Sequence, residues 1–164
     1  MSVRLLLISD THIPGRARRL PAAVLAQADL ADLVIHAGDW VAASVLDDLA
    51  QHAEVLGVYG NNDGPDVRAR LPEVARREIE GVRFAVIHET GDAQRRHMRT
   101  DAAFPDVDVL VFGHSHIPWD SVTPGGLRLL NPGSPTDRRR QPHCTMMTAT
   151  IDDGALRAVE LISI

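Results

Sequence analysis

The stretch "VLVFGHSHIP", Val109–Pro118, places two histidines one residue apart at the end of an apolar run. Residues 107 to 112 are dominated by Val, Leu and Phe, which predicts a buried strand, and Gly113 ends it. His114 and His116 are therefore expected on the loop that follows the strand. A single histidine beside a strand is more often packed or solvated than bound to a metal. The meaning of the pair depends on whether ligand-type side chains follow other strands as well.

The sequence before this stretch alternates between apolar runs and amphipathic segments. Apolar or alternating runs predict strands over Val3–Ile8, Leu33–Ala37, Glu54–Tyr59 and Val82–Ile87. Amphipathic segments predict helices over Leu20–Ala28, Ala42–His52 and Asp92–Ala103. Repeated strand–helix units of this kind are typical of a sheet that is buried on both faces.

The sequence after Gly113 consists of short runs separated by turn sequences such as "TPGG" and "DDG". These runs predict strands over Asp120–Val122, Leu127–Leu130, Cys144–Asp152 and Leu156–Ile164. We expect them to form an antiparallel second sheet that follows the strand–helix part. Because no linker-like stretch separates the two parts, residues 1–164 are expected to form one domain.

The composition excludes several classes of protein. A chain of 164 residues that is 45% hydrophobic has the size and composition of one globular domain with a core. Cys144 is the only cysteine, which excludes an intramolecular disulfide and a thiolate zinc cluster. All 17 basic residues are arginine, which excludes lysine Schiff-base chemistry and a Walker-type lysine. The net charge of −5 argues against extended nucleic-acid binding.

The apolar runs are too short for a secretion signal or a membrane span. We therefore expect a cytoplasmic protein with no membrane partner.

Metal-ligand residue types follow each strand predicted in the first part of the chain. Beyond the two histidines of the opening stretch, the strand ends carry Asp10 and His12, then Asp39, then Asn61, then His88. Ligands of open α/β sheets gather beyond the carboxyl ends of the strands, so these side chains are expected to converge on one point. They are more ligands than one ion uses, and a central aspartate can bridge two ions about 3.5–4 Å apart. The pattern favours a dinuclear metal site.

The motifs D-x-H, G-D, G-N-x-D, a strand-end histidine and G-H-x-H occur here in this order. The chain thereby resembles the calcineurin-like metallophosphoesterase superfamily, and "NPGS", Asn131–Ser134, resembles its small bacterial and archaeal phosphodiesterase branch. The resemblance implies an α/β (α+β) fold: a four-layer α-β-β-α sandwich with two packed mixed sheets.

The resemblance also implies two sets of metal ligands. The first ion would be held by Asp10, His12, Asp39 and His116, and the second by Asp39, Asn61, His88 and His114. Imidazole and carboxylate ligands suit divalent transition metals, with manganese as the first expectation and iron, zinc, nickel or cobalt as alternatives. The implied reaction is hydrolysis of a phosphodiester in a small phosphorylated or nucleotide-like substrate, by in-line attack of a hydroxide that bridges the two ions.

Other residues receive secondary roles. Arg16 and Arg138 are candidates for neutralising phosphate oxygens, although a solvated arginine is the commoner case. Ser115 is expected to be structural, as the variable residue of G-H-x-H. His36 is expected in the core or behind the ligands, and Trp40 is a candidate either for a pocket wall or for ordinary packing.

Asn62 marks the main departure from the superfamily, because many members carry histidine there as a general acid or phosphate contact. An amide cannot donate a proton as an imidazolium does, so esters with basic alkoxide leaving groups should react less well. Asn62 and Asp63 are nevertheless the candidate catalytic residues, Asn62 as a phosphate contact and Asp63 as a residue that fixes the loop. The alternatives are a phosphomonoesterase and a metal-bearing interaction scaffold, as in the retromer subunit with this fold. Homo-oligomerisation is left open.

Overall fold

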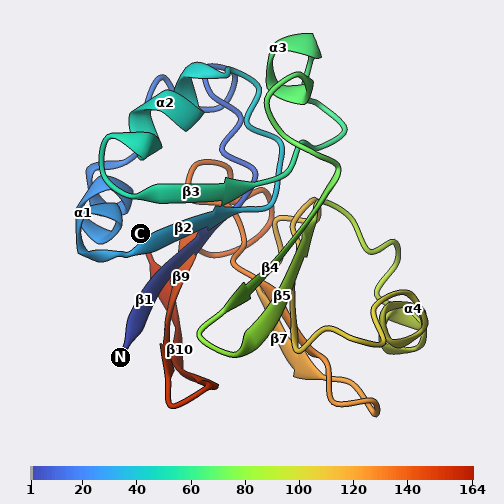
Figure 1. Ribbon diagram of the computed structural model, residues 1–164. Helices are drawn as coiled ribbons and strands as arrows, with labels where there is room; N and C mark the ends of the chain where they lie inside the picture. Colours follow the sequence, from blue (N-terminus) through green and yellow to red (C-terminus); the bar gives the residue numbers. More distant parts are fainter. Residues whose placement is uncertain (1) are drawn as a thin grey trace.

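The computed structural model describes residues 2–164 and contains two five-stranded sheets packed face to face (Figure 1). The first sheet has the order β10-β9-β1-β2-β3, with bounds Ala155–Ser163, Thr145–Asp152, Val3–Ile8, Leu33–His36 and Glu54–Gly57. The second has the order β4-β5-β6-β8-β7, with bounds Val74–Ile79, Val82–Ile87, Val109–Val111, Arg128–Asn131 and Trp119–Val122. Both sheets are mixed, so the predicted fold class is confirmed.

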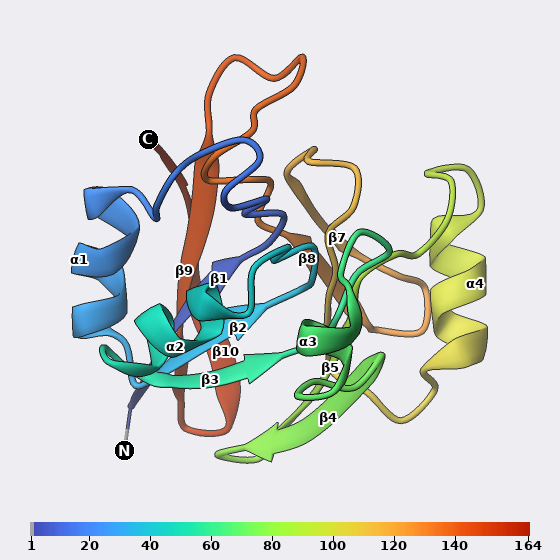
Figure 2. The same ribbon diagram turned by 90° about the horizontal axis from the view of Figure 1, so that it is seen from above.

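Alternating side chains of β1 divide between two layers of core. Leu5 and Leu7 point into the cluster between the two sheets, whereas Leu6 and Ile8 point into the cluster under the helices. Successive residues of a strand face opposite sides, which explains the continuous apolar sequence of this strand. The helices over the outer face of the first sheet are α1, Ala22–Leu30, and α2, Ser44–Ala50 (Figures 1 and 2).

The second sheet is covered by α4, Arg96–Ala103, on the side away from the first sheet (Figure 2). Phe104, directly after this helix, packs in one cluster with Leu110 and Leu129. Together with α1 and α2, this helix completes the four layers. The single-turn helix α3, Pro65–Arg68, lies between β3 and β4.

The predicted grouping of the strands is wrong in one respect. Strands β9 and β10 do not belong to a separate second sheet, because β9 pairs antiparallel with β1 and β10 pairs with β9. The second sheet instead begins before the opening stretch, with β4 and β5, and β8 pairs parallel with β6. Alternation of side chains decides which residues are buried, but it does not decide which strands become neighbours.

Several boundaries also differ from the prediction. The sequence analysis missed α3 and β4, and the helix predicted from Asp92 begins at Arg96. The strand β4 escaped notice because it is an edge strand in which exposed and buried positions alternate and the exposed ones include Arg76. None of the helices within residues 2–164 is long and apolar enough to cross a membrane.

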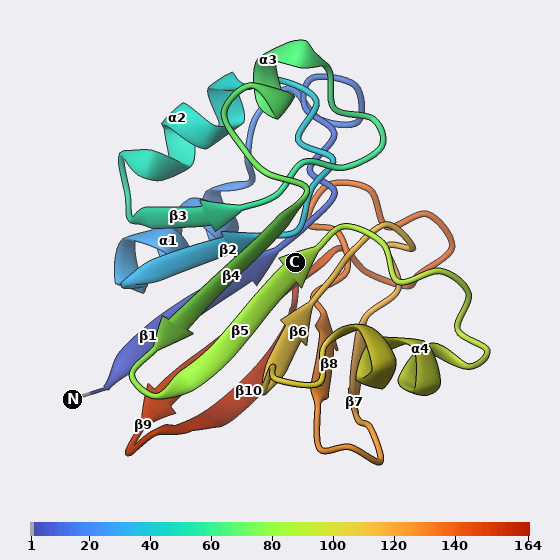
Figure 3. The ribbon, with the colours of Figure 1, turned by 45° about the vertical axis from the view of Figure 1, so that its right-hand side comes forward.

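The loops that carry the predicted ligands lie at one end of the sandwich. Strands β1, β2 and β3 of the first sheet run parallel, as do β5 and β6 of the second. Their carboxyl ends point to the same end of the molecule (Figure 3). Side chains that follow strands of both sheets therefore meet at this end of the sandwich.

Candidate metal centre

Six of the predicted ligands form two groups at this end of the sandwich. Within each group the possible ligand atoms all lie within 4.8 Å of one another. The groups are Asp10, His12 and His116, and Asp39, His88 and His114. Each group combines an aspartate from the first sheet with histidine from the second, so the groups connect the two sheets.

The carboxylate of Asp39 lies between the two groups. Its Oδ2 is 3.4 Å from Nε2 of His12 and also 3.4 Å from Nε2 of His88. The seventh predicted ligand, Asn61, belongs with the second group, because its Oδ1 is 3.1 Å from Nδ1 of His114. The structure thus brings all seven predicted ligands together around Asp39.

The polar atoms that face the centre of the site fit a metal ion. Oδ1 of Asp10, Nε2 of His12 and Nε2 of His116 are buried and have no hydrogen-bond partner. Nε2 of His116 and Oδ1 of Asp10 are 3.5 Å apart, and Nε2 of His12 is 3.8 Å from the same oxygen. Buried polar atoms are nearly always partnered, so three unpartnered atoms facing one point indicate a cation site. Nitrogen and oxygen donors of this kind suit a divalent transition metal.

Main-chain carbonyls orient two of the histidines. Nδ1 of His88 lies 2.7 Å from the carbonyl oxygen of Ala37, and Nδ1 of His116 lies 2.7 Å from that of Asp137. A carbonyl only accepts, so each Nδ1 carries the proton and each Nε2 presents its lone pair to the site. Second contacts of this type hold a metal-binding imidazole in the required tautomer and orientation.

The two aspartates are ionised at neutral pH. Burial opposes ionisation of Asp10, but the imidazoles of His116 and His12 hold the pKa of its carboxyl well below the usual range. Burial also opposes ionisation of Asp39, yet the neighbouring His88 and the N–H groups of Asn62 lower its pKa to about 2. Both carboxylates are therefore available as anionic ligands.

Five site residues adopt left-handed backbone conformations, with φ of 58° at Asp10, 44° at His12, 60° at Asp39, 72° at His114 and 60° at His116. Such conformations cost an ordinary residue roughly 1–3 kcal/mol each, and they cluster at functional sites. No sequence signal revealed them, since all five positions carry side chains. A sharply turned chain allows loops from both sheets to direct these side chains into one small volume.

Two glycines permit this close approach. A Cβ on Gly60 would overlap the carboxylate of Asp39, and a Cβ on Gly113 would overlap the Ser9 hydroxyl. The sequence analysis singled out Gly113 only as the residue that ends a strand. In the structure, atoms of neighbouring loops lie too close to the backbone of Gly60 and Gly113 to leave room for a side chain.

Asp63 joins the loop after β3 to the loop after β2. Its Oδ2 accepts hydrogen bonds from the main-chain N–H groups of Asp39 and Gly60, at 3.0 and 2.8 Å. Its Oδ1 accepts from the N–H of Val41 at 2.7 Å. Burial raises the pKa of Asp63, and these three donors offset part of that effect. Its two oxygens are directed to main-chain donors.

The "NPGS" segment supports the other ligand loops. The Asn131 side chain donates to the carbonyl oxygen of Gly113 and to the hydroxyl of Ser115, both at 3.2 Å. Ser134 donates to the carbonyl oxygen of Asp10 at 2.7 Å. Ser115 thus has partners within the loop network, as expected for a structural residue.

Asn62 contacts the central carboxylate directly. Its side-chain amide donates to Oδ2 of Asp39 at 2.8 Å, and its main-chain N–H donates to Oδ1 at 2.9 Å. The predicted phosphate contact therefore lies at the mouth of the site, where its side chain is exposed.

The arginines near the site differ in their placement. Arg16 forms an ion pair with Asp137 at 3.3 Å, and Arg138 donates to the carbonyl oxygen of Gln141. Arg139 donates to the carbonyl oxygen of His114 at 3.3 Å. Of these three arginine side chains, that of Arg139 hydrogen-bonds to one of the predicted ligand residues, whereas Arg16 reaches His12 through its main-chain N–H at 2.7 Å.

His36 lies in the core behind the ligand loops. Its ring stacks on Trp40 with 3.6 Å between ring centroids, and both residues are completely buried. Nδ1 of His36 accepts the N–H of Gly38, so Nε2 carries the proton and donates to the hydroxyl of Thr11 at 3.1 Å. Burial lowers the pKa of His36 to about 3. Trp40 therefore packs in the core and does not wall a pocket.

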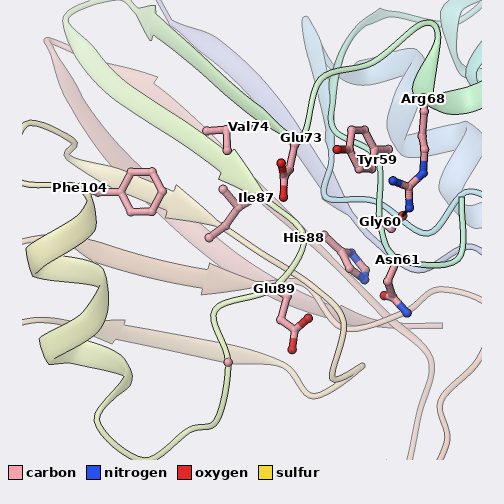
Figure 4. A pocket seen from close by; sticks show the side chains of 11 residues that line it. Tyr59, Gly60, Asn61, Arg68, Glu73, Val74, Ile87, His88, Glu89 and Phe104 are labelled. Atoms are coloured by element: carbon pink, nitrogen blue, oxygen red, sulfur yellow. Dashed lines mark hydrogen bonds between the residues drawn. The ribbon is translucent and has the colours of Figure 1, made fainter.

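A cleft of about 620 Å³ opens beside the second group (Figure 4). His88 and Asn61 form the end of the cleft next to the metal centre, and it extends past Val74 of β4 and Ile87 of β5 to Phe104, directly after α4. Its lining comprises Tyr59, Gly60, Asn61, Arg68, Glu73, Val74, Ile87, His88, Glu89, Gly91 and Phe104. The sequence analysis missed this cleft because β4 was not predicted.

Comparison with known proteins identifies the family. Residues 3–154 match the calcineurin-like phosphoesterase superfamily domain, so the chain belongs to this superfamily of metallophosphoesterases. A probable metallophosphoesterase of Methanocaldococcus jannaschii is 38% identical over 153 residues, which cover 90% of this chain and 75% of that protein. The resemblance inferred from the motifs is therefore confirmed.

Solved structures share the fold over the whole chain. The solution NMR structure of a Thermotoga maritima protein is 35% identical, with a TM-score of 0.77 and coverage of 99% of both chains. The crystal structure of Vps29 from Entamoeba histolytica complexed with Zn²⁺ has a TM-score of 0.73 at 24% identity, and the match covers 98% of both chains. At this level of identity the second similarity concerns the fold alone.

Proposed function

We propose that the protein is a metal-dependent phosphodiesterase that uses two divalent transition-metal ions, with manganese as the first choice. The observation that carries this proposal is the position of Asp39, whose Oδ2 lies 3.4 Å from histidines of both ligand groups. Asp10, His12 and His116 would hold one ion with Asp39, and Asn61, His88 and His114 would hold the other. When bound, the ions supply Lewis acidity that polarises the phosphoryl group and activates a water molecule for in-line attack.

The chain's own residues then bind and orient the ester. The Asn62 residue is exposed beside Asp39, and its side-chain amide would donate a hydrogen bond to a phosphate oxygen. Arg139, which hydrogen-bonds to the main chain of His114, would add positive charge beside the ligand loops. Asp63 is a positioning residue in this scheme, because both of its oxygens bind main-chain N–H groups.

The absence of an imidazole at residue 62 favours diesters with good leaving groups. An asparagine cannot donate a proton to a departing alkoxide, so an aryl ester should react faster than an alkyl ester. A phosphomonoesterase is the alternative within the same chemistry. Rates on matched aryl diesters and monoesters distinguish the two.

Replacing Asp39 tests the proposal. The isosteric Asp39→Asn variant removes the shared negative charge, so we expect weaker binding of both ions and a loss of hydrolysis of roughly 100-fold or more. The measurements are metal content by elemental analysis and hydrolysis of bis(p-nitrophenyl) phosphate with added Mn²⁺. Asp153→Asn, in the turn between β9 and β10, is the matched control and should behave as the wild type. Unchanged activity of Asp39→Asn would refute the assignment.

A scaffold function is the second candidate, favoured by asparagine at residue 62 and by the fold shared with Vps29. The filled set of ligand-type residues at the site weighs against it. Protein that binds metal but hydrolyses neither the diester nor the monoester would support this candidate.

A further inference from the structure

The cleft that begins at His88 and Asn61 extends well beyond the predicted ligands. Its middle is apolar, with Ile87 and Val74 from two neighbouring strands and the Phe104 ring at the far end (Figure 4). A volume of about 620 Å³ exceeds what a phosphate group needs. An organic substituent of the ester can therefore occupy the cleft while its phosphate lies at the metal centre.

Two carboxylates without an arginine partner line this cleft. Glu73 precedes β4 and Glu89 follows β5, and both side chains are exposed. Within residues 2–164, Glu73 forms no ion pair and Glu89 has only a 3.7 Å contact with Nε2 of His114. Elsewhere on the surface, acidic residues such as Asp108 and Asp120 pair closely with arginines. The two glutamates are thus available to a ligand.

The nearby guanidinium groups are directed to the protein backbone. Arg68 donates to the carbonyl oxygens of Asp63 and Gly60 and lies over the Tyr59 ring at 4.4 Å. Arg99, next to Gly91, donates to the carbonyl oxygens of Thr90 and Gln94. The carboxylates of the lining outnumber its one arginine, so the part of the cleft away from the metals favours a cation and disfavours a second anion.

We propose that the cleft binds the alcohol part of a phosphodiester whose alcohol carries an ammonium group on an apolar body. The apolar residues contact the carbon skeleton, and Glu73 and Glu89 attract the positive charge. This inference rests on the proposed phosphodiesterase function and names the substrate class that the site selects.

Three p-nitrophenyl diesters test whether the cleft prefers an ammonium group. They share a leaving group and differ in the charge of the other alcohol. The first is p-nitrophenyl phosphocholine. In the second, 3,3-dimethylbutyl replaces choline, so a neutral carbon replaces the ammonium nitrogen in the same shape. In the third, 3-carboxypropyl replaces choline and carries a negative charge. With Mn²⁺-loaded protein we expect kcat/KM for the choline ester to exceed that for its isostere by about fivefold to tenfold, and the carboxylate ester to be the slowest.

Substitution of the two glutamates tests whether they cause the preference for the choline ester over its neutral isostere. In the double variant Glu73→Gln/Glu89→Gln, the ratio between the choline ester and its isostere should fall to about one. The matched control is Glu160→Gln, which removes the same charge from β10, outside the cleft, and should keep the wild-type ratio. An unchanged ratio in the double variant would overturn the role of the glutamates.

A binding measurement does not depend on turnover. In Zn²⁺-loaded protein, titration with phosphocholine should shift the methyl resonance of Ile87 with a Kd several-fold lower than titration with 3,3-dimethylbutyl phosphate. Hydrolysis of none of the three diesters would overturn the proposed function, and this titration would still decide the inference. Hydrolysis of all three at equal kcat/KM, with equal Kd values for the two monoesters, would overturn the inference and leave the phosphodiesterase function intact.

Discussion

The Asn62 side-chain amide donates a hydrogen bond, at 2.8 Å, to the carboxylate of Asp39, which lies between the two ligand groups. If the amide limits protonation of the leaving group, then Asn62→His should speed hydrolysis of an alkyl diester by about tenfold or more, because positioned acids contribute about 10²–10⁴-fold. Hydrolysis of an aryl diester should change much less. The measurement is kcat on matched methyl and p-nitrophenyl esters, and an equal change on both would exclude this role.

The buried His36 side chain should make the free energy of unfolding depend on pH. Its pKa is about 3 in the folded protein, against about 6.5 in an unfolded chain, so only the unfolded state takes up this proton between those values. The neutral ring therefore contributes stability that is fully present above pH 6.5 and is lost as the pH falls towards 3. The slope is up to about 1.4 kcal/mol per pH unit.

The His36→Gln variant should show a shallower fall in the free energy of unfolding over this range, by up to about 1.4 kcal/mol per pH unit. The comparison requires metal-free protein and urea titrations at several pH values. His52→Gln is the control, because His52 is half-buried beside the exposed Asp29 and lies outside the core. Parallel pH profiles for the wild type and His36→Gln would contradict the assignment of a neutral buried ring.

At the scale of elements, the loops after β2 and β3 act as one unit through Asp63. The Asp63→Asn variant keeps the shape but replaces one accepting oxygen with an N–H donor that faces main-chain N–H groups. We expect metal affinity to fall by about 10–100-fold, as for other contacts that orient ligands. Calorimetric titration with Mn²⁺ measures this, and Asp66→Asn on α3 is the control. Wild-type affinity in Asp63→Asn would show that the ligand loop holds its shape without this contact.

The elements also show how far the sequence predicts the structure. The strands that precede Asp10, Asp39 and His88 were predicted from their apolar runs, and the polar residues that follow these runs were predicted to meet at one end of the sheet. The antiparallel pairing of β9 with β1 was not predicted, because the alternation of apolar and polar side chains does not specify which strand is the partner. The left-handed conformation of Asp39 and the contacts of Arg139 depend on loops that meet only in the folded chain.

At the scale of the whole molecule, the candidate metal centre connects the two sheets, since Asp10 and Asp39 follow strands of one and His88 and His116 follow strands of the other. Metal binding should therefore stabilise the sandwich as a unit. At a free Mn²⁺ concentration 100 times the Kd, the expected gain is about 2.7 kcal/mol. For a chain of this size that corresponds to a rise in Tm of roughly 5–10 °C.

Calorimetric scans with Mn²⁺ and with a chelator measure this shift. The Asp39→Asn variant should lose most of it, whereas Asp153→Asn should retain it. A Tm that is independent of metal in the wild type would contradict a site that connects the two sheets.

The position of β1 in the centre of its sheet also affects how the chain is completed during synthesis. One neighbour of β1 is β2, but the other is β9, and Ser134 hydrogen-bonds to Asp10 across 124 residues of sequence. Ribosomes add about 5–20 residues per second, so the time between synthesis of β1 and synthesis of β9 is on the order of ten seconds. Throughout that interval the apolar edge of β1 has no partner, and a nascent chain that stalls before β9 exposes it to aggregation or to chaperones.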